Sequence, residues 1–162
     1  MSTHQETVER AKADLLQAKE QLSRALSTTP NDRINWSPCA TARTPIQQVA
    51  HAANAIKNIH EMLCGQTFQA KTTAEADKSF REWEQQFTTR EPVIQLLEEN
   101  SAAYVQWLDA LAPEDLTGTV EAPFGLGAVP MMAALAFAPG HTNFHAAQIE
   151  YIQTIYGDRV WH

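Results

Sequence analysis

The sequence predicts an all-α protein, a four-helix bundle. Three observations lead to this prediction: four amphipathic segments, helix start and stop signals at their ends, and one connection of more than twenty residues. The sequence offers no β-strand of consequence, no internal repeat and no low-complexity tract. A long connection can cross a bundle and let two helices run parallel, whereas short loops force neighbouring helices to run antiparallel. The expected topology is therefore up-down-down-up.

Length, composition and charge set the class of protein. The 162 residues are expected to form one domain, 1–162, because a chain of this length buries most of its apolar surface in a single core. The formal net charge is −7, and no cluster of Lys and Arg interrupts it. Nucleic acids and anionic membranes need a positive patch, so neither is an expected partner. No signal peptide or membrane-spanning run is present, so we expect a cytoplasmic protein.

The first helix is predicted from about Ser2 to Ala25. Its apolar positions recur every three or four residues between charged ones: Val8, Ala11, Leu15, Ala18, Leu22 and Ala25. The next stretch, 27–44, is rich in Pro, Ser, Thr and Asn and follows neither the helical nor the strand period. We expect an ordered loop there, held in place by Trp36.

The second helix has clear ends. Thr44 is a good N-cap, Pro45 suits the first helical position, and Gly65 ends the helix after Cys64. Its apolar stripe consists of Ile46, Val49, Ala53, Ile56, Ile59 and Leu63. At 100° per residue, His60 falls inside this stripe and His51 lies nearly opposite. The pattern alone favours a hydrogen-bonded core histidine at His60 and a solvated one at His51.

The connection after Gly65 and the third helix follow. Residues 74–86 are expected to form a short helix within the connection. Thr88 and Glu91 have the spacing of a capping box, so the third helix is predicted to start near Arg90. The helix is predicted to extend to the stop signal at Ala112 and Pro113. Its apolar stripe consists of Val93, Leu97, Tyr104, Leu108 and Leu111.

The last part of the chain contains a loop and a long helix. A short extended piece is expected at 119–121, and the glycines at 125 and 127 indicate a turn because they lack the spacing of a phosphate-binding loop. The final helix is predicted from Pro130 to Tyr156. Pro139 and Gly140 should kink or break it one residue before His141.

Two cysteines, Cys39 and Cys64, lie far apart and form no CxxC pair, which excludes a zinc ribbon and a thioredoxin-like motif. Cys64 falls on the apolar face of its helix and is expected to be a small buried hydrophobic residue. Cys39 is expected to be a surface or half-buried loop residue, since nothing in the sequence indicates a lowered thiol pKa.

His141 and His145 are the first candidates for a functional site. A spacing of four is only about 40° of rotation on a helix, so both imidazoles leave the same face and can share one metal ion. Spacing alone leaves a structural or solvated role equally open. Small or apolar residues share this face, so the pair should point into the bundle, where it needs hydrogen bonds, water or a metal. A zinc protease is not expected, because the position after the first histidine is Thr142 rather than a glutamate base.

Three stretches of the sequence together resemble the DinB/YfiT-like proteins of the DinB superfamily. These stretches are TPIQQVAHAAN at 44–54, APFG at 122–125, and HTNFHAAQIEYIQTIYGD at 141–158. The resemblance covers nearly the whole chain. The family is marked by one histidine in the Val-Ala-His segment of the second helix and by His-x-x-x-His in the last helix. The matching positions are His51, His141 and His145.

The resemblance implies a homodimeric four-helix bundle with a divalent metal held by these three histidines and with coordination positions open to water or substrate. The resemblance thus assigns His51 to the metal site, whereas the helical pattern alone left this residue solvated. Imidazole suits several metals, and zinc or nickel is expected first, with iron or manganese as further candidates. Three polar residues are candidates for supporting the metal ligands or lining a pocket, or are ordinary polar residues of their helices: Asn54, Asn58 and Gln148.

Family members of known activity are thiol-dependent transferases and isomerases. The resemblance therefore implies a metal-dependent S-transferase or isomerase with a low-molecular-weight thiol or another small molecule as substrate, or a metal-dependent hydrolase. The alternative is a non-catalytic, stress-associated metal-binding homodimer. A closed coordination shell would indicate that alternative, and exchangeable positions would indicate catalysis. The sequence identifies no catalytic side chain and no cofactor site other than the metal.

Overall fold

The computed structural model describes residues 3–160 and residue 162, and it confirms the predicted four-helix bundle. The bundle consists of α1 (Thr3–Thr28), α2 (Pro45–Leu63), α4 (Arg90–Ala110) and α6 (Phe137–Ile155). Between them lie α3 (Thr73–Glu84), the 3₁₀ helix η1 (Pro113–Thr117), α5 (Met131–Ala134) and the strands β1 (Thr119–Ala122) and β2 (Gly127–Pro130). None of the helices described is both long and apolar enough to cross a membrane.

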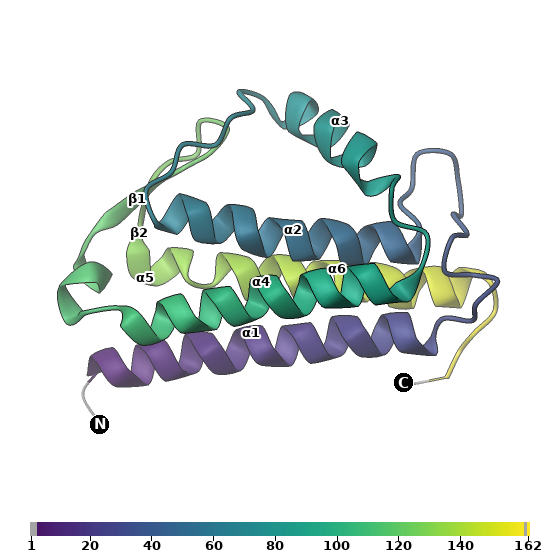
Figure 1. Ribbon diagram of the computed structural model, residues 1–162, viewed down its shortest axis with the longest axis horizontal. Coiled ribbons are helices and arrows are strands. Elements are labelled where there is room, and N and C mark those ends of the chain that lie inside the picture. The colour runs from purple at the N-terminus through teal and green to yellow at the C-terminus, as the bar shows by residue number, and fades with distance from the viewer. Residues whose placement is uncertain (1–2, 161) are drawn as a thin grey trace.

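The directions of the bundle helices follow from their contacts and from Figure 1. Ion pairs of 2.6 Å join Lys12 to Asp109 and Lys19 to Glu98, so α1 and α4 run antiparallel. Figure 1 shows α1 and α6 running one way and α2 and α4 running the other. The connection from α2 to α4 makes this possible, because it returns along the bundle and carries α3 over the outer side of α2.

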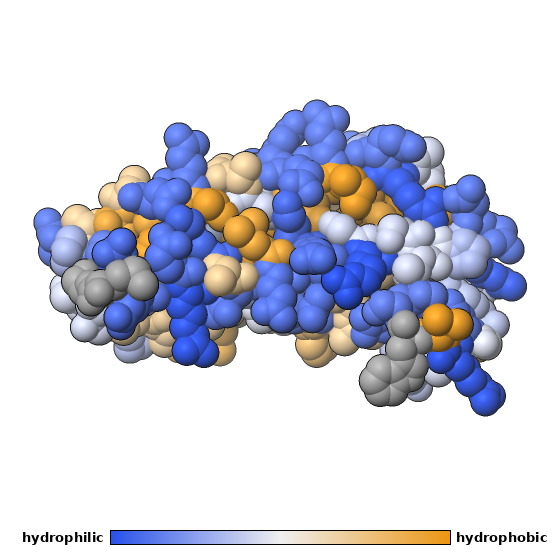
Figure 2. All heavy atoms as spheres, turned by 90° about the horizontal axis from the view of Figure 1, so that it is seen from below, coloured by the Kyte–Doolittle hydropathy of each residue, from blue (hydrophilic) through white to orange (hydrophobic). Residues whose placement is uncertain are grey.

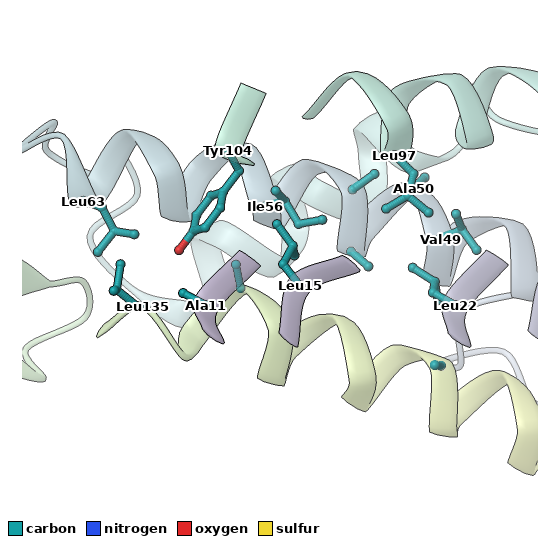
Figure 3. Packing of buried hydrophobic residues seen from close by; sticks show 14 of the residues in the cluster. Ala11, Leu15, Leu22, Val49, Ala50, Ile56, Leu63, Leu97, Tyr104 and Leu135 are labelled. Carbon is teal, nitrogen blue, oxygen red and sulfur yellow. The ribbon is translucent and has the colours of Figure 1, made fainter. Parts of the chain in front are cut away.

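The core lies between the four long helices. All six apolar positions predicted for the first helix are buried, and so are the predicted positions of the second, except for the half-buried Ile59. Figure 3 shows Leu15 of α1 close to Ile56 of α2, and Tyr104 of α4 pointing between Leu63 and Leu135. The opposite sides of the helices are polar, and Figure 2 shows a largely hydrophilic face with separate apolar patches. The helical period therefore identified the core-facing sides correctly.

Two predictions about helix ends are wrong. Cys64 is exposed rather than buried, because α2 ends at Leu63 and Cys64 is its C-cap, beyond the last turn of the apolar stripe. The capping box predicted at Thr88 and Glu91 does not form, since the N-cap of α4 is Thr89 and its side chain makes no capping hydrogen bond. The predicted start of the helix at Arg90 is nevertheless confirmed.

The last helix is interrupted earlier than predicted. The break lies at Leu135 and Ala136, between α5 and α6, and α6 is continuous through Pro139 and Gly140. Pro139 falls in the first turn of α6, where a missing N–H removes no intrahelical hydrogen bond. His141 therefore stands on a regular helix.

The segment after η1 forms a hairpin. The predicted extended piece at 119–121 is part of β1, which pairs antiparallel with β2 from Thr119 opposite Pro130 to Ala122 opposite Gly127. Gly125 has a φ of 77° and Gly127 a φ of 76°, which glycine adopts without strain. The predicted turn at these glycines is thus confirmed.

The N-cap of α2 offers a matched pair of substitutions. The Thr44 hydroxyl accepts a hydrogen bond from the Gln47 backbone N–H, and the Gln47 side chain accepts one from the Thr44 backbone N–H. We expect Thr44→Ala to lower the free energy of unfolding by about 1 kcal/mol. Thr89→Ala, at an N-cap without a side-chain hydrogen bond, should change it less. Urea unfolding measures both, and equal losses would contradict this account of the cap.

Candidate metal centre

Three histidines from two helices converge at one point in the bundle. His51 comes from α2, and His141 and His145 come from successive turns of α6. One ring nitrogen from each residue lies within 4.8 Å of those of the other two. The Nε2 atoms of His141 and His145 are 3.3 Å apart. The structure thus brings together His141 and His145, which the helical spacing paired, and His51, which the resemblance assigned to the same site.

A hydrogen bond to Gln48 orients His145. Its Nδ1 lies 2.6 Å from Oε1 of Gln48, one turn before His51 on α2. An amide oxygen can only accept, so His145 donates from Nδ1 and keeps the lone pair of Nε2 for a ligand. Both side chains are buried, with 5% of His145 and 6% of Gln48 exposed.

A buried carboxylate orients His51 in the same way. Nδ1 of His51 lies 2.7 Å from Oε1 of Glu84, the last residue of α3. The other carboxylate oxygen accepts a hydrogen bond of 2.6 Å from Nε of Arg43, whose guanidinium also donates to Asp77. Only 1% of the Glu84 side chain is exposed. Carboxylates that accept from the second nitrogen of a metal-binding histidine fix its tautomer and its ring orientation.

The expectation that His51 is solvated is therefore wrong. Only 12% of its side chain is exposed, because α3 covers the polar side of α2 with Glu84 and Phe80. The Phe80 ring packs edge-on against the His51 imidazole at a centroid distance of 5.3 Å. The angular positions of residues around α2 could not predict this burial, because we had assumed that the side of α2 opposite the bundle core faces water.

The environment keeps two of the imidazoles uncharged. Burial, together with the neighbouring His51 and Arg43, lowers the pKa of His141 to about 4. Burial, together with the neighbouring His141 and His51, lowers the pKa of His145 to about 3. Both rings are neutral at pH 7, which is the form that binds a metal.

The residues present fit a divalent metal ion. The donor set of the cluster is three imidazoles, a set that zinc sites use when a further position stays open to a small molecule. Nδ1 of His141 is buried without a hydrogen-bond partner. Polar ring atoms confined at this depth favour a ligand that compensates their lost hydration.

The remaining sequence candidates lie around the cluster or away from it. His60 is half-buried, packs its ring against Tyr104 and Trp107 at 5.7 and 5.2 Å, and has a pKa lowered by burial. It packs against the core, as its position in the apolar stripe predicted, but among the described residues its ring has no hydrogen-bond partner, and it is no part of the histidine cluster. Gln148 is half-buried, and its side-chain oxygen has no hydrogen-bond partner.

A pocket of about 200 Å³ adjoins the histidines. His51 and His141 line it together with Asn58 and seven apolar residues: Ala55, Ile59, Met62, Phe68, Phe80, Pro123 and Phe124. Asn54 lines a neighbouring pocket of about 380 Å³ that shares Asn58. The cluster is therefore reached through a mainly apolar recess.

Sequence reasoning missed the three side chains that support the histidines. Gln48 lies within the stretch 44–54 that resembles the family, but nothing there marked it as a partner of His145. Arg43 and Glu84 lie in polar surroundings without a motif, and Glu84 meets His51 across 33 positions. The one available hint was the helical pattern of 74–86, which placed a helix there without saying which face of the bundle it covers.

Comparisons with known proteins agree with this fold. A family model described as the DinB superfamily matches residues 14–149. No curated protein matches the chain in sequence. Among solved structures, YfiT from Bacillus subtilis, described as a probable metal-dependent hydrolase with an unusual four-helix bundle topology, has a TM-score of 0.71 at 18% identity. The match covers 97% of this chain and 90% of that one.

Two further structures are similar. A mycothiol-dependent maleylpyruvate isomerase has a TM-score of 0.68 at 17% identity, over 92% of this chain and 63% of that one. The DinB-like protein YjoA from Bacillus subtilis has a TM-score of 0.63 at 15% identity, over 94% of this chain and 96% of that one. At these identities the likeness shows a shared fold.

The Glu84 carboxylate should influence metal affinity without touching the metal. We expect Glu84→Gln to weaken binding of Zn²⁺ or Ni²⁺ by about 10- to 100-fold, because the amide accepts a weaker hydrogen bond from His51 and leaves Nε of Arg43 without a charged acceptor, although Arg43 keeps its ion pair with Asp77. Glu82→Gln, at an exposed position of the same helix, is the matched control. Competition titration with a chromogenic chelator measures both affinities. Equal affinities in the two variants would contradict the role assigned to Glu84.

The lowered pKa values predict how the metal-free protein responds to acid. The unfolded chain protonates its histidines near pH 6.5, whereas folded His141 and His145 resist protonation until the pH reaches about 4 and about 3. Between these limits the unfolded state binds more protons, so the free energy of unfolding must fall as the pH falls. We expect each histidine to contribute a loss of about 2 kcal/mol from about pH 6.5 to about pH 5.

Urea unfolding in the presence of a chelator measures this dependence. His145→Gln should show a shallower fall than the unsubstituted protein, because one of the two groups is gone. Identical slopes would mean that burial of His145 does not suppress its protonation.

Proposed function

The chain belongs to the DinB superfamily, and from this premise we propose that it is a metal-dependent enzyme whose divalent ion is held by His51, His141 and His145. The observation that supports this most directly is the convergence of three imidazoles beside a pocket, with no cysteine or acidic residue in the described cluster. Three protein ligands leave coordination positions for a substrate, whereas structural zinc sites use four.

Such an ion acts as a Lewis acid that lowers the pKa of a bound water or of a thiol. The chain's own residues prepare the site for it. Glu84 and Gln48 accept hydrogen bonds from the Nδ1–H groups of His51 and His145, so that both Nε2 atoms keep their lone pairs. Arg43 balances the charge of Glu84. The apolar wall formed by Phe68, Phe80 and Phe124 limits the access of water, which strengthens electrostatic interactions inside the pocket.

Two reactions are compatible with this arrangement. One similar protein is described as a probable metal-dependent hydrolase and another as a mycothiol-dependent isomerase. We therefore propose either hydrolysis or an S-transfer or isomerisation that uses a small thiol as cosubstrate. Zinc or nickel is the proposed metal because imidazole ligands suit both. A homodimeric, cytoplasmic protein remains our expectation.

The test is whether small molecules reach the metal. We expect Co²⁺-loaded protein to develop an intense near-ultraviolet charge-transfer band when a small thiol such as 2-mercaptoethanol is added, because an open position accepts the thiolate sulfur. The band should disappear when a chelator removes the cobalt. Titration followed by absorption spectroscopy measures the affinity.

Turnover separates a hydrolase from a thiol-dependent enzyme, because both have an open position that accepts a thiol. Hydrolysis of a small ester without added thiol would select hydrolysis, and reaction only with added thiol would select S-transfer or isomerisation. A spectrum that does not respond to thiols, azide or pH would indicate a closed coordination shell around the metal. It would contradict the enzyme and favour a non-catalytic metal-binding protein.

A further inference from the structure

We propose that the substrate of this protein carries a compact, uncharged apolar group, one ring or a branched aliphatic chain, that occupies the pocket beside His51 and His141. The inference rests on the proposed function and names the class of molecule that the site takes. Four properties of the pocket carry it: its walls, its lack of charged side chains, its volume and the backbone of Phe124.

The three phenylalanines of the pocket come from segments outside the four bundle helices, whereas Ala55, Asn58, Ile59 and Met62 line it from α2. Phe68 lies in the loop after α2, Phe80 on α3, and Phe124 in the turn of the β1–β2 hairpin. Phe68 packs edge-on against both of the others, with ring centroids 6.2 Å from Phe80 and 5.3 Å from Phe124. Figure 1 shows the loop and the hairpin side by side at the end of α2. Three aromatic side chains thus line the recess together with His51 and His141.

The pocket lining contains no Asp, Glu, Lys or Arg. Asn58 and the two histidines are its polar members, and the other seven residues are apolar. The charged groups behind His51, Arg43 and Glu84, are already paired with each other. Away from the histidines, a charged substituent would meet no charged side chain in this lining and would lose its hydration, which disfavours binding. An apolar group gains from the same environment.

The volume limits the size of that group. The pocket measures about 200 Å³, and a dry cavity of about 150 Å³ is known to hold one benzene ring. One ring with a small substituent therefore fills this volume, and we expect two fused rings to extend beyond it toward the neighbouring pocket. The reacting end of the substrate would lie at the histidines and its apolar end among the phenylalanines.

The backbone of Phe124, in the wall of the pocket, has an unusual conformation. Its φ is 61°, in the left-handed region that bulky residues rarely adopt. Backbone strain of this kind is found at ligand clamps, where the surrounding structure holds it in place. Asparagine tolerates the left-handed region far better and would remove the ring. Phe124 is therefore assigned as a specificity-determining residue of the pocket.

The test uses metal-free protein first, so that its outcome does not depend on metal binding. Methyl-labelled methionine provides two reporters: Met62, which lines the pocket, and Met132, which is 53% exposed elsewhere. We expect benzyl alcohol to shift the Met62 methyl resonance and leave that of Met132 unchanged. Benzylamine, which is charged, and 2-naphthalenemethanol, which is too large, should each bind at least tenfold more weakly.

Three variants complete the test. Ala55→Leu fills the pocket and should abolish the Met62 response, while Ala147→Leu, the same change at an exposed position of α6, should leave it intact. Phe124→Asn should weaken benzyl alcohol binding at least tenfold with the Met132 signal unchanged. Equal binding of the three probes, or a Met62 response that survives both Ala55→Leu and Phe124→Asn, would overturn the proposal.

Metal-loaded protein separates this inference from the proposed function. We expect benzyl mercaptan to bind the Co²⁺ form at least tenfold more tightly than 2-mercaptoethanol, with the preference lost in Ala55→Leu. Equal affinity of the two thiols would overturn the apolar pocket while leaving the metal site standing. Failure to load any metal, with the Met62 response intact, would instead contradict the proposed function.

Discussion

The hydrogen bond between His51 and the buried carboxylate of Glu84 ties the candidate site to the fold. Burying an ionised carboxylate is unfavourable unless it is paired, and here Arg43 and the His51 ring N–H provide two charge-assisted or polar contacts at 2.6 and 2.7 Å. The same contacts fix the end of α3 against the outer side of α2. The helix that covers His51 is therefore also the helix that orients it, and Phe80 reaches the pocket because α3 is held there.

The bundle helices and the segments that connect them contribute different parts of the candidate site. Helices α2 and α6 supply the imidazoles, so their separation depends on core packing that tolerates little change. The loop after α2, the helix α3 and the turn of the hairpin supply the three phenylalanines of the pocket wall from outside the four bundle helices. Such segments can change in sequence without disturbing the bundle.

The sequence was sufficient for features with a local signal. Apolar positions at helical spacing predicted the buried sides of α1 and α2, and Thr44 with Pro45 predicted where α2 begins. The spacing of His141 and His145 predicted that they meet, since four residues are one helical turn. The sequence was insufficient where an element distant in the chain determines the burial or the hydrogen-bond partner of a residue. The side of α2 that carries His51 is polar and resembles a solvent face, and only the position of α3 makes it an interior. Gln48 meets His145 across 97 positions, which no local pattern reveals.

The central claim is that three histidines, with His51 rather than His60 as the third, hold one divalent ion. Elemental analysis of tag-free protein loaded with Zn²⁺ or Ni²⁺ tests it most directly when the unsubstituted chain is compared with His51→Ala and His60→Ala. The account predicts about one equivalent of metal per chain in the unsubstituted protein and in His60→Ala, and loss of the metal in His51→Ala. Metal absent from the unsubstituted protein after loading, or lost only in His60→Ala, would contradict it.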